Sequence, residues 1–200
     1  MKDVLSRYPR DFGDGLTLRP MEPADEQALT AFFTRIPVDE RRLFKDDVRR
    51  SSVIRGWIQK LDYAKILPLL LFEGGRVIAD ATLHRDKHGW SRHVAEVRVA
   101  LDPEFRGRGL ARRLLQEFIE IGPSLDVAIL NAFVLDVQHE ARELVESAGF
   151  VPQATLAQQA IDLAGRVHDV LVYSCTLTPP ERLAPEASLS EEEADVGGGA

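Results

Sequence analysis

The sequence lacks several features that would decide its class at once. It has 200 residues but a single cysteine, Cys175, so no disulfide can form within the chain. Cys175 stands in an apparent strand without an obvious basic partner, which favours a buried thiol over a nucleophile. No segment approaches the roughly 20 consecutive apolar residues that a membrane span needs, and the N-terminus has no apolar stretch typical of a signal peptide. We therefore expect a cytoplasmic protein with no membrane partner.

Basic residues are also outnumbered, with 25 Lys and Arg against 32 Asp and Glu. The formal net charge is -7, and acidic residues gather after Pro180, where Arg182 is the only basic residue. The segment 179–200, rich in Glu, Pro, Ser and Gly, predicts an acidic disordered tail. The remainder is close to neutral and shows no basic face, which argues against nucleic acid as a partner. Length and composition fit one domain, which we place at 15–178 after a flexible lead at 1–14.

Three familiar binding motifs are missing as well. The chain contains neither Gly-x-x-x-x-Gly-Lys-Ser/Thr nor Gly-x-Gly-x-x-Gly, which excludes the usual nucleotide fingerprints. His84 and His88 have a spacing that suits two metal ligands on a helix, but they fall in a predicted strand and turn. We therefore expect no metal site.

The chain does have a strand, a loop and a helix in direct succession. The segment 94–101 alternates as a sheet strand does, and Asp102-Pro103 ends it. The loop Arg106-Gly-Arg-Gly109-Leu-Ala111 then enters a predicted helix at 109–121. Glycine lets the backbone approach a ligand closely, and the unpaired amides of a first helical turn carry partial positive charge. The pattern predicts a cradle for a phosphate or diphosphate, with a loop that merely starts a helix as the alternative.

The same loop carries a resemblance. Arg106-Gly-Arg-Gly109-Leu-Ala111 matches every fixed position of Arg/Gln-x-x-Gly-x-Gly/Ala, and the chain resembles the GNAT superfamily of acyl-CoA-dependent N-acyltransferases over residues 15–177. The segment 16–26 resembles the first strand and helix of that superfamily, 73–83 its second hairpin, and 141–150 the helix that ends in Gly-Phe. Glu96 lies ten residues before Arg106, and with the segment 36–44 this makes the sequence most similar to the GNAT domain of bacterial protein lysine acetyltransferases.

The element order and the resemblance together predict the fold. We expect an α/β fold of the α+β type, with a mixed, partly antiparallel central sheet of about seven strands and about four helices. Strands are expected at 16–19, 67–72, 76–84, 92–101, 127–135, 154–163 and 167–177. Helices are expected from residue 22, across 39–60 with an interruption near Ser51 and Ser52, at 109–121 and at 139–148. The resemblance implies that the sheet splays between its fourth and fifth strands.

The resemblance also implies acetyl-CoA as the cofactor and names the residues that would bind it. The diphosphate would be held by the backbone of Arg106, Gly107, Arg108, Gly109, Leu110 and Ala111. The side chains of Arg106 and Arg108 could add charge-assisted contacts, although a solvated basic turn is the alternative. The pantetheine arm would bond to the backbone of Val97, Arg98 and Val99, whose amides suit the stabilisation of an oxyanion. Gln138 stands where many members carry an asparagine that contacts the cofactor.

Glu96 is the predicted general base. A lysine-type amine has a free pKa of about 10.4, so at neutral pH it must lose a proton before it can attack. By resemblance, Glu96 lies where similar lysine acetyltransferases place their glutamate base, and we expect partial burial to raise its pKa. The alternative is an outward-facing carboxylate paired with Arg98 or Arg92.

The usual general acid is missing. Val145 stands where many superfamily members carry a tyrosine that protonates the leaving thiolate, so we expect water to take that role. The resemblance thus implies an N-acetyltransferase that transfers an acetyl group to a primary amine, such as a protein lysine, by direct attack. A small-molecule amine acetyltransferase and a non-catalytic acyl-CoA-binding regulatory module stay open, as do a monomer and a homodimer.

Overall fold

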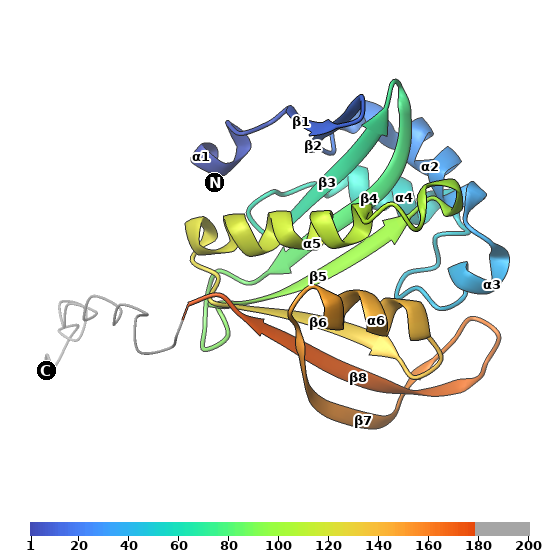
Figure 1. Ribbon diagram of the computed structural model, residues 1–200. Helices are drawn as coiled ribbons and strands as arrows, with labels where there is room; N and C mark the ends of the chain where they lie inside the picture. The colour runs from blue at the N-terminus through green and yellow to red at the C-terminus, as the bar shows by residue number, and fades with distance from the viewer. Residues whose placement is uncertain (179–200) are drawn as a thin grey trace, which may run out of the picture.

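The computed structural model describes residues 1–178, and the predicted acidic tail at 179–200 lies outside the described residues. The described chain forms one eight-stranded sheet with helices on both faces (Figure 1). The strands are β1 (Arg10–Gly13), β2 (Leu16–Pro20), β3 (Ile66–Glu73), β4 (Arg76–Arg85), β5 (Val94–Leu101), β6 (Ile129–Leu135), β7 (Val151–Ile161) and β8 (Val167–Thr176). The helices are α1 (Lys2–Leu5), α2 (Glu26–Arg35), α3 (Val38–Arg41), α4 (Ser51–Gln59), α5 (Leu110–Ile121) and α6 (His139–Ser147), with short 3-10 turns at Pro23–Asp25, Pro103–Phe105 and Gly122–Leu125. No helix in this part of the chain is both long enough and apolar enough to cross a membrane.

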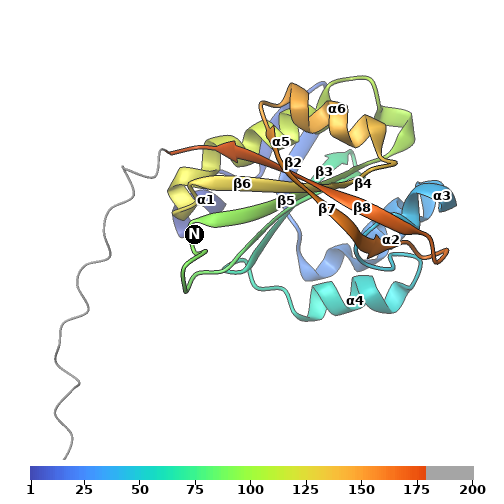
Figure 2. The ribbon, with the colours of Figure 1, turned by 90° about the horizontal axis from the view of Figure 1, so that it is seen from below.

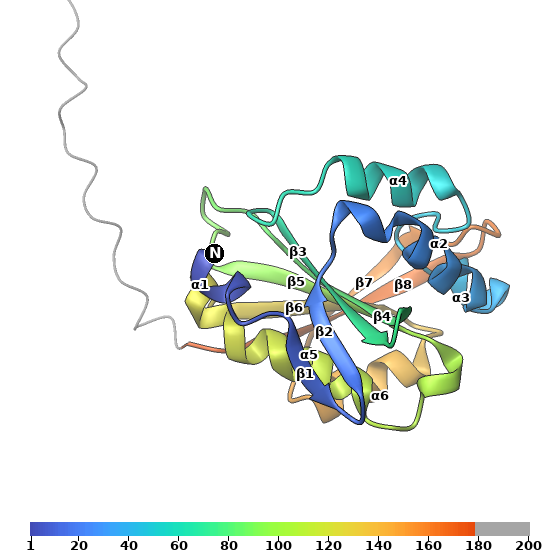
Figure 3. The same ribbon diagram turned by 90° about the horizontal axis from the view of Figure 1, so that it is seen from above.

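Alternating apolar side chains give the sheet two buried faces. In β3, Leu67, Leu69 and Leu71 belong to one hydrophobic core, whereas Leu70 and Phe72 belong to the other, because successive side chains of a strand point to opposite faces. Helices α5 and α6 cover the first face, and α2 and α4 cover the second (Figures 2 and 3). Each fully buried leucine contributes about 1.5–3 kcal/mol, so a polar side chain on either face needs a reason to be there.

Helix α5 sets the position of the loop at 106–111, called the glycine loop below. Its buried residues recur every three or four positions and hold one side of the helix against the sheet: Leu110, Leu114, Leu115, Phe118 and Ile121. Gly109 is the N-cap, with a φ of 71°. This left-handed conformation costs other residues about 1–2 kcal/mol, so glycine suits the point where the loop turns into the helix. The predicted helix after the strand is confirmed.

The N-terminal segment holds elements that the sequence did not predict. Residues 1–14, expected to be a flexible lead, contain α1 and β1, and β1 pairs with β2 from Arg10↔Leu18 onward. Val4 and Phe12 are buried in the core on the α5 side. Phe12 is the only buried side chain of this four-residue strand, so the strand has no apolar alternation to reveal it.

The region 39–60 also differs in detail from the prediction. Helix α3 ends at Arg41 and α4 begins at Ser51, so the interruption spans 42–50 and Ser51 starts a helix. Phe44 lies in this interruption and packs edge-on against Phe33 of α2, with 6.0 Å between ring centroids. Phe44 and Val48 both pack with the second core, so the loop at 42–50 lies beside the second sheet face.

The sheet opens between β5 and β6. These strands run parallel, and their register covers only three residue pairs, from Val94↔Ile129 to Glu96↔Asn131. Beyond Glu96 the two strands diverge, while β5 stays paired with β4 as far as Leu101 (Figure 1). The mixed sheet and its opening between the fourth and fifth predicted strands are confirmed, with eight strands instead of about seven.

Candidate active site

A cavity crosses the sheet at this opening. Its volume is about 750 Å³, within the usual range for small-molecule sites. The walls come from strands on both sides of the opening and from helices on both faces of the sheet. They include Phe33, Phe44, Trp57, Val97, Val99, Leu115, Ala132, Val134 and Val145. A ligand with a long, narrow arm could therefore pass from one face of the sheet to the other.

The glycine loop next to the opening has the backbone geometry of an anion cradle. Gly107 and Gly109 have φ angles of 73° and 71°, and a Cβ added at either would meet nothing within 4 Å. No side chain of the described residues caps the N-terminus of α5. The first-turn amides, from Leu110 and Ala111 onward, therefore keep their partial positive charge for a ligand. Their contact with a diphosphate stays a prediction.

Arg106 is held differently from the expectation. Its guanidinium donates two hydrogen bonds to the Glu40 carboxylate, at 3.0 and 2.6 Å, and its backbone amide donates to the carbonyl of Pro103 at 3.3 Å. Arg106 thus ties α3 to the loop, and both its amide and its side chain are engaged within the protein. Arg108 is exposed and lies over the Phe105 ring, with 4.7 Å from Cζ to the centroid. Arg108 is the more exposed of the two arginines, and its guanidinium also donates to the Glu104 carbonyl at 3.2 Å.

One edge of β5 lines the opening where the pantetheine arm is predicted to bind. Val97 and Val99 pair with β4, but neither pairs with β6, because the β5 and β6 register ends at Glu96. Both residues border the cavity. Gln138 lies just beyond β6 and borders the same cavity, while its side-chain oxygen accepts a hydrogen bond from the Leu135 amide at 2.9 Å. The structure therefore brings these three predicted residues together around one space.

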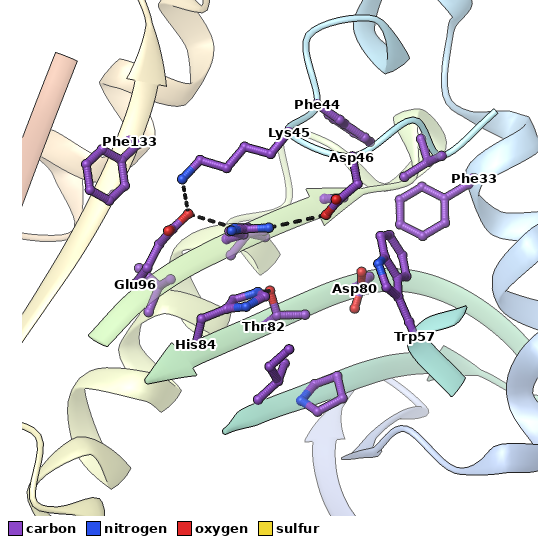
Figure 4. A pocket seen from close by; sticks show the side chains of 18 of the residues that line it. Phe33, Phe44, Lys45, Asp46, Trp57, Asp80, Thr82, His84, Glu96 and Phe133 are labelled. Atoms are coloured by element: carbon purple, nitrogen blue, oxygen red, sulfur yellow. Dashed lines mark hydrogen bonds and ion pairs between the residues drawn. The ribbon is translucent and has the colours of Figure 1, made fainter. Parts of the chain in front are cut away.

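Glu96 is surrounded by cations. Lys45, from the loop at 42–50, donates to Oε1 of Glu96 at 2.5 Å, and Arg98 donates to the same oxygen at 2.7 Å (Figure 4). Burial pulls the pKa of Glu96 upward, but the hydrogen bonds and charges of Arg98 and Lys45 outweigh burial and hold the pKa below its usual range. The predicted net rise of the Glu96 pKa is therefore wrong, because the two cations reverse the effect of burial. Glu96 does border the cavity where β5 and β6 separate, and its role as base stays a prediction.

Two titratable groups of β4 border the same cavity (Figure 4). Oδ1 of Asp80 is buried and has no hydrogen-bond partner within residues 1–178. Burial raises the pKa of Asp80 to about 7, although the Arg98 charge lowers it. Burial also lowers the pKa of His84 to about 4, so its ring is neutral at physiological pH, with Nε2 3.0 Å from the Thr82 hydroxyl. Sequence reasoning missed Asp80, although a carboxylate amid the apolar residues of β4 was a usable signal; Lys45 gave no signal.

The usual tyrosine general acid has no counterpart among the described residues that line the cavity. No tyrosine lines it in the part of the chain that the structure describes, and Val145 is buried in its wall. Cys175 packs against the core away from the cavity lining, and burial raises the pKa of its thiol, as expected for an inert cysteine. Across residues 1–178, no group of three His, Cys, Asp or Glu side chains is arranged to hold a metal ion.

Sequence comparison links this fold and cavity to known proteins. The model of the acetyltransferase (GNAT) family matches residues 29–150. Acetyltransferase Pat from Mycolicibacterium smegmatis (strain ATCC 700084 / mc(2)155) is 28% identical over 142 residues, which make up 70% of this chain and 42% of Pat. The chain thus spans less than half the length of the curated relatives it matches.

Solved structures share the fold. The yncA protein from Salmonella typhimurium, which holds acetyl-CoA, superposes with a TM-score of 0.69 at 22% identity over 87% of this chain and 99% of yncA. RimL, a ribosomal L7/L12 alpha-N-protein acetyltransferase in complex with coenzyme A, gives a TM-score of 0.73 at 15% identity over 83% of this chain and 96% of RimL. Because the family match extends from α2 to the end of α6, and so contains the glycine loop, the opening and Glu96, the chain belongs to the acetyltransferase (GNAT) family.

Proposed function

We propose that this protein is an acetyl-CoA-dependent N-acetyltransferase that transfers an acetyl group to a primary amine by direct attack. The observation that carries the proposal is the cavity that joins the opening between β5 and β6 to Glu96. Helices α5 and α6 both begin at the end of the sheet where β5 and β6 diverge (Figure 1). The first-turn amides of α5, which no described side chain caps, therefore lie at the same end of the sheet as the opening. The acetyl-CoA in yncA and the coenzyme A in RimL support the choice of donor.

The glycine loop and the free edge of β5 would bind the donor. The α5 amides would hold its diphosphate, and the backbone of Val97, Arg98 and Val99 would hold the pantetheine arm. A thioester drawn along this edge would reach the narrow end of the opening, next to Glu96. Backbone amides there could stabilise the oxyanion that forms as the amine attacks.

Glu96 would accept the proton of the attacking amine. Glu96 would be a stronger base without the Lys45 ammonium, because the charged hydrogen bonds from Lys45 and Arg98 hold its pKa down. The amine then attacks the thioester carbonyl, and the leaving thiolate takes a proton from water, since valine occupies position 145. Water suffices for this step because a thiol has a pKa of only about 8.5.

Acetyl-CoA binding and turnover test the proposal separately. We expect saturating acetyl-CoA to raise the melting temperature, whereas acetyl phosphate, which lacks the nucleotide, leaves it unchanged. Glu96→Gln should keep this thermal shift and lose at least about a hundredfold in turnover, the usual contribution of a general base. Glu104→Gln is the matched control. Glu104 lies in the turn Pro103–Phe105, and its carboxylate pairs with Arg76 of β4; neither residue lines the cavity. An unchanged melting temperature in acetyl-CoA would refute the proposal, and full activity in Glu96→Gln would assign the base to another group.

A protein lysine is the acceptor class that we propose first, on the similarity to bacterial protein lysine acetyltransferases. A screen of intact proteins and small amines by mass spectrometry decides between this class and a small-molecule amine. A non-catalytic acyl-CoA-binding module is the second candidate, favoured by the double pairing of Glu96 and by a cavity without tyrosine among the described residues. Donor binding without transfer to any acceptor, the protein's own lysines included, would favour that module.

A further inference from the structure

Lys45 occupies the place that an attacking amine needs. Its Nζ lies 2.5 Å from Oε1 of Glu96 on β5 and 4.3 Å from the ring centroid of Phe133 on β6. The ammonium thus lies between β5 and β6 where the two strands begin to separate (Figure 4). Phe133 is two residues beyond Asn131, the last β6 residue in register with β5. All three side chains in contact border the cavity.

Stability alone gives a weak reason for this contact. The Lys45 side chain is 46% exposed and that of Glu96 19%, and such a pair contributes at most about 1 kcal/mol. The position of Lys45 suits a reaction better. Base-assisted acyl transfer requires an amine that is hydrogen-bonded to a carboxylate, and Lys45 and Glu96 would form such a pair beside an acyl donor bound in the cavity. An external amine that approaches Oε1 of Glu96 would compete with Lys45 for the same oxygen.

We propose that Lys45 is itself an acetyl acceptor and that the protein acetylates this side chain within one molecule. The inference rests on the proposed function, since the acetyl group comes from acetyl-CoA bound in the same cavity. Glu96 takes one proton from the Nζ ammonium, and the nitrogen lone pair attacks the thioester carbonyl carbon. The carbon–sulfur bond breaks, and the nitrogen releases its second surplus proton to water as the amide forms. Coenzyme A leaves as a thiolate that takes a proton from water. The products are Nε-acetylated Lys45 and free coenzyme A, and no oxidant or reductant is consumed.

Acetylation changes the electrostatics of Glu96. An amide carries no charge, so one of the two cations that hold the pKa of Glu96 down is removed while Arg98 remains. The pKa of Glu96 then moves upward, toward the range in which a carboxylate accepts and releases a proton efficiently. Self-acetylation would therefore make Glu96 a stronger base for an external amine.

Isotope-labelled acetyl-CoA tests the proposal on the full chain. The label separates acetyl groups added in the assay from any acquired during expression, and peptide mass spectrometry locates them. We expect one label on Lys45, at a rate that saturates with acetyl-CoA and does not change when the protein is diluted. Glu96→Gln should slow labelling of Lys45 by at least about a hundredfold. Lys45→Arg should lose this label, whereas Lys65→Arg, at an exposed lysine outside the cavity lining, should keep it.

The contrary results are distinct. A labelling rate that falls on dilution would assign the reaction to two molecules and overturn the intramolecular step. Label spread evenly over exposed lysines, without saturation in acetyl-CoA, would mean chemical acetylation and overturn the inference as well. A thermal shift in acetyl-CoA with Lys45 unlabelled overturns this inference and leaves the proposed function standing. Absence of both the thermal shift and the label refutes the proposed function, and the inference with it.

Discussion

Asp80 should make the protein less stable as pH rises. Burial raises its pKa from 3.8 to about 7, so the folded protein holds this proton more tightly than the unfolded chain does. The contribution of the protonated carboxyl is fully present below about pH 4 and is lost as the pH rises through about 7. A difference of about three pKa units, at about 1.4 kcal/mol each, gives about 4 kcal/mol, or about half of that if the cavity relaxes around the charge.

The Asp80→Asn variant isolates this effect. Asparagine keeps the shape of the side chain and carries no charge at any pH. We expect wild type and variant to be similarly stable near pH 4, and the wild type to fall about 2–4 kcal/mol below the variant in unfolding free energy by pH 8. Urea denaturation at a series of pH values measures the difference by linear extrapolation.

The control for this experiment is Asp86→Asn. Asp86 is an exposed carboxylate on the loop after β4, and its substitution removes the same formal charge without touching the cavity. We expect this variant to follow the wild type across the series. A difference between Asp80→Asn and wild type that stays flat from pH 4 to pH 8 would refute the reasoning, because it would mean that Asp80 ionises as readily in the folded protein as in the unfolded chain.

Three further substitutions probe the loop and its supports. Gly107→Ala puts a Cβ at a φ of 73° in open space, so we expect about 1 kcal/mol less stability and weaker acetyl-CoA binding by calorimetry; unchanged binding would contradict the cradle. Asp102→Asn replaces the buried carboxylate that two partly exposed arginines bind, and the loss of charged hydrogen bonds should cost about 2 kcal/mol in urea denaturation; a variant as stable as wild type would show that these ion pairs add nothing. Glu40→Gln releases Arg106 toward the diphosphate and should tighten acetyl-CoA binding several-fold in titration; weaker binding would mean that the tether orders the loop.

The sequence predicts those parts of the fold whose cause is local. The alternation of 94–101, the Asp102-Pro103 stop and the two glycines act within a few residues of one another, so the strand, the loop and α5 could be read directly. The opening of the sheet followed from the resemblance rather than from any residue pattern. Strand β1 was missed because one phenylalanine among charged residues carries no periodic signal.

The electrostatics of the site could not be predicted from the sequence, because the charged groups that pair there are far apart in the chain. Lys45 is 51 residues from Glu96 in the chain, and Glu40 is 66 residues from Arg106. Both partners come from the segment between α2 and α4, whose path is set by tertiary packing of Phe44 rather than by local propensity. The sign of the Glu96 pKa shift therefore had to come from the structure.

Because the pairing of β5 and β6 ends early, only three residue pairs between these strands join the two halves of the sheet. A donor molecule bound between β5 and β6 would contact both halves of the sheet, and its binding free energy would add to the free energy of unfolding. At a concentration of about one hundred times its dissociation constant, such a ligand contributes about 2.7 kcal/mol. The lifetime of the folded protein would then follow the supply of acyl donor, so that substrate availability governs both how fast the enzyme works and how much of it persists.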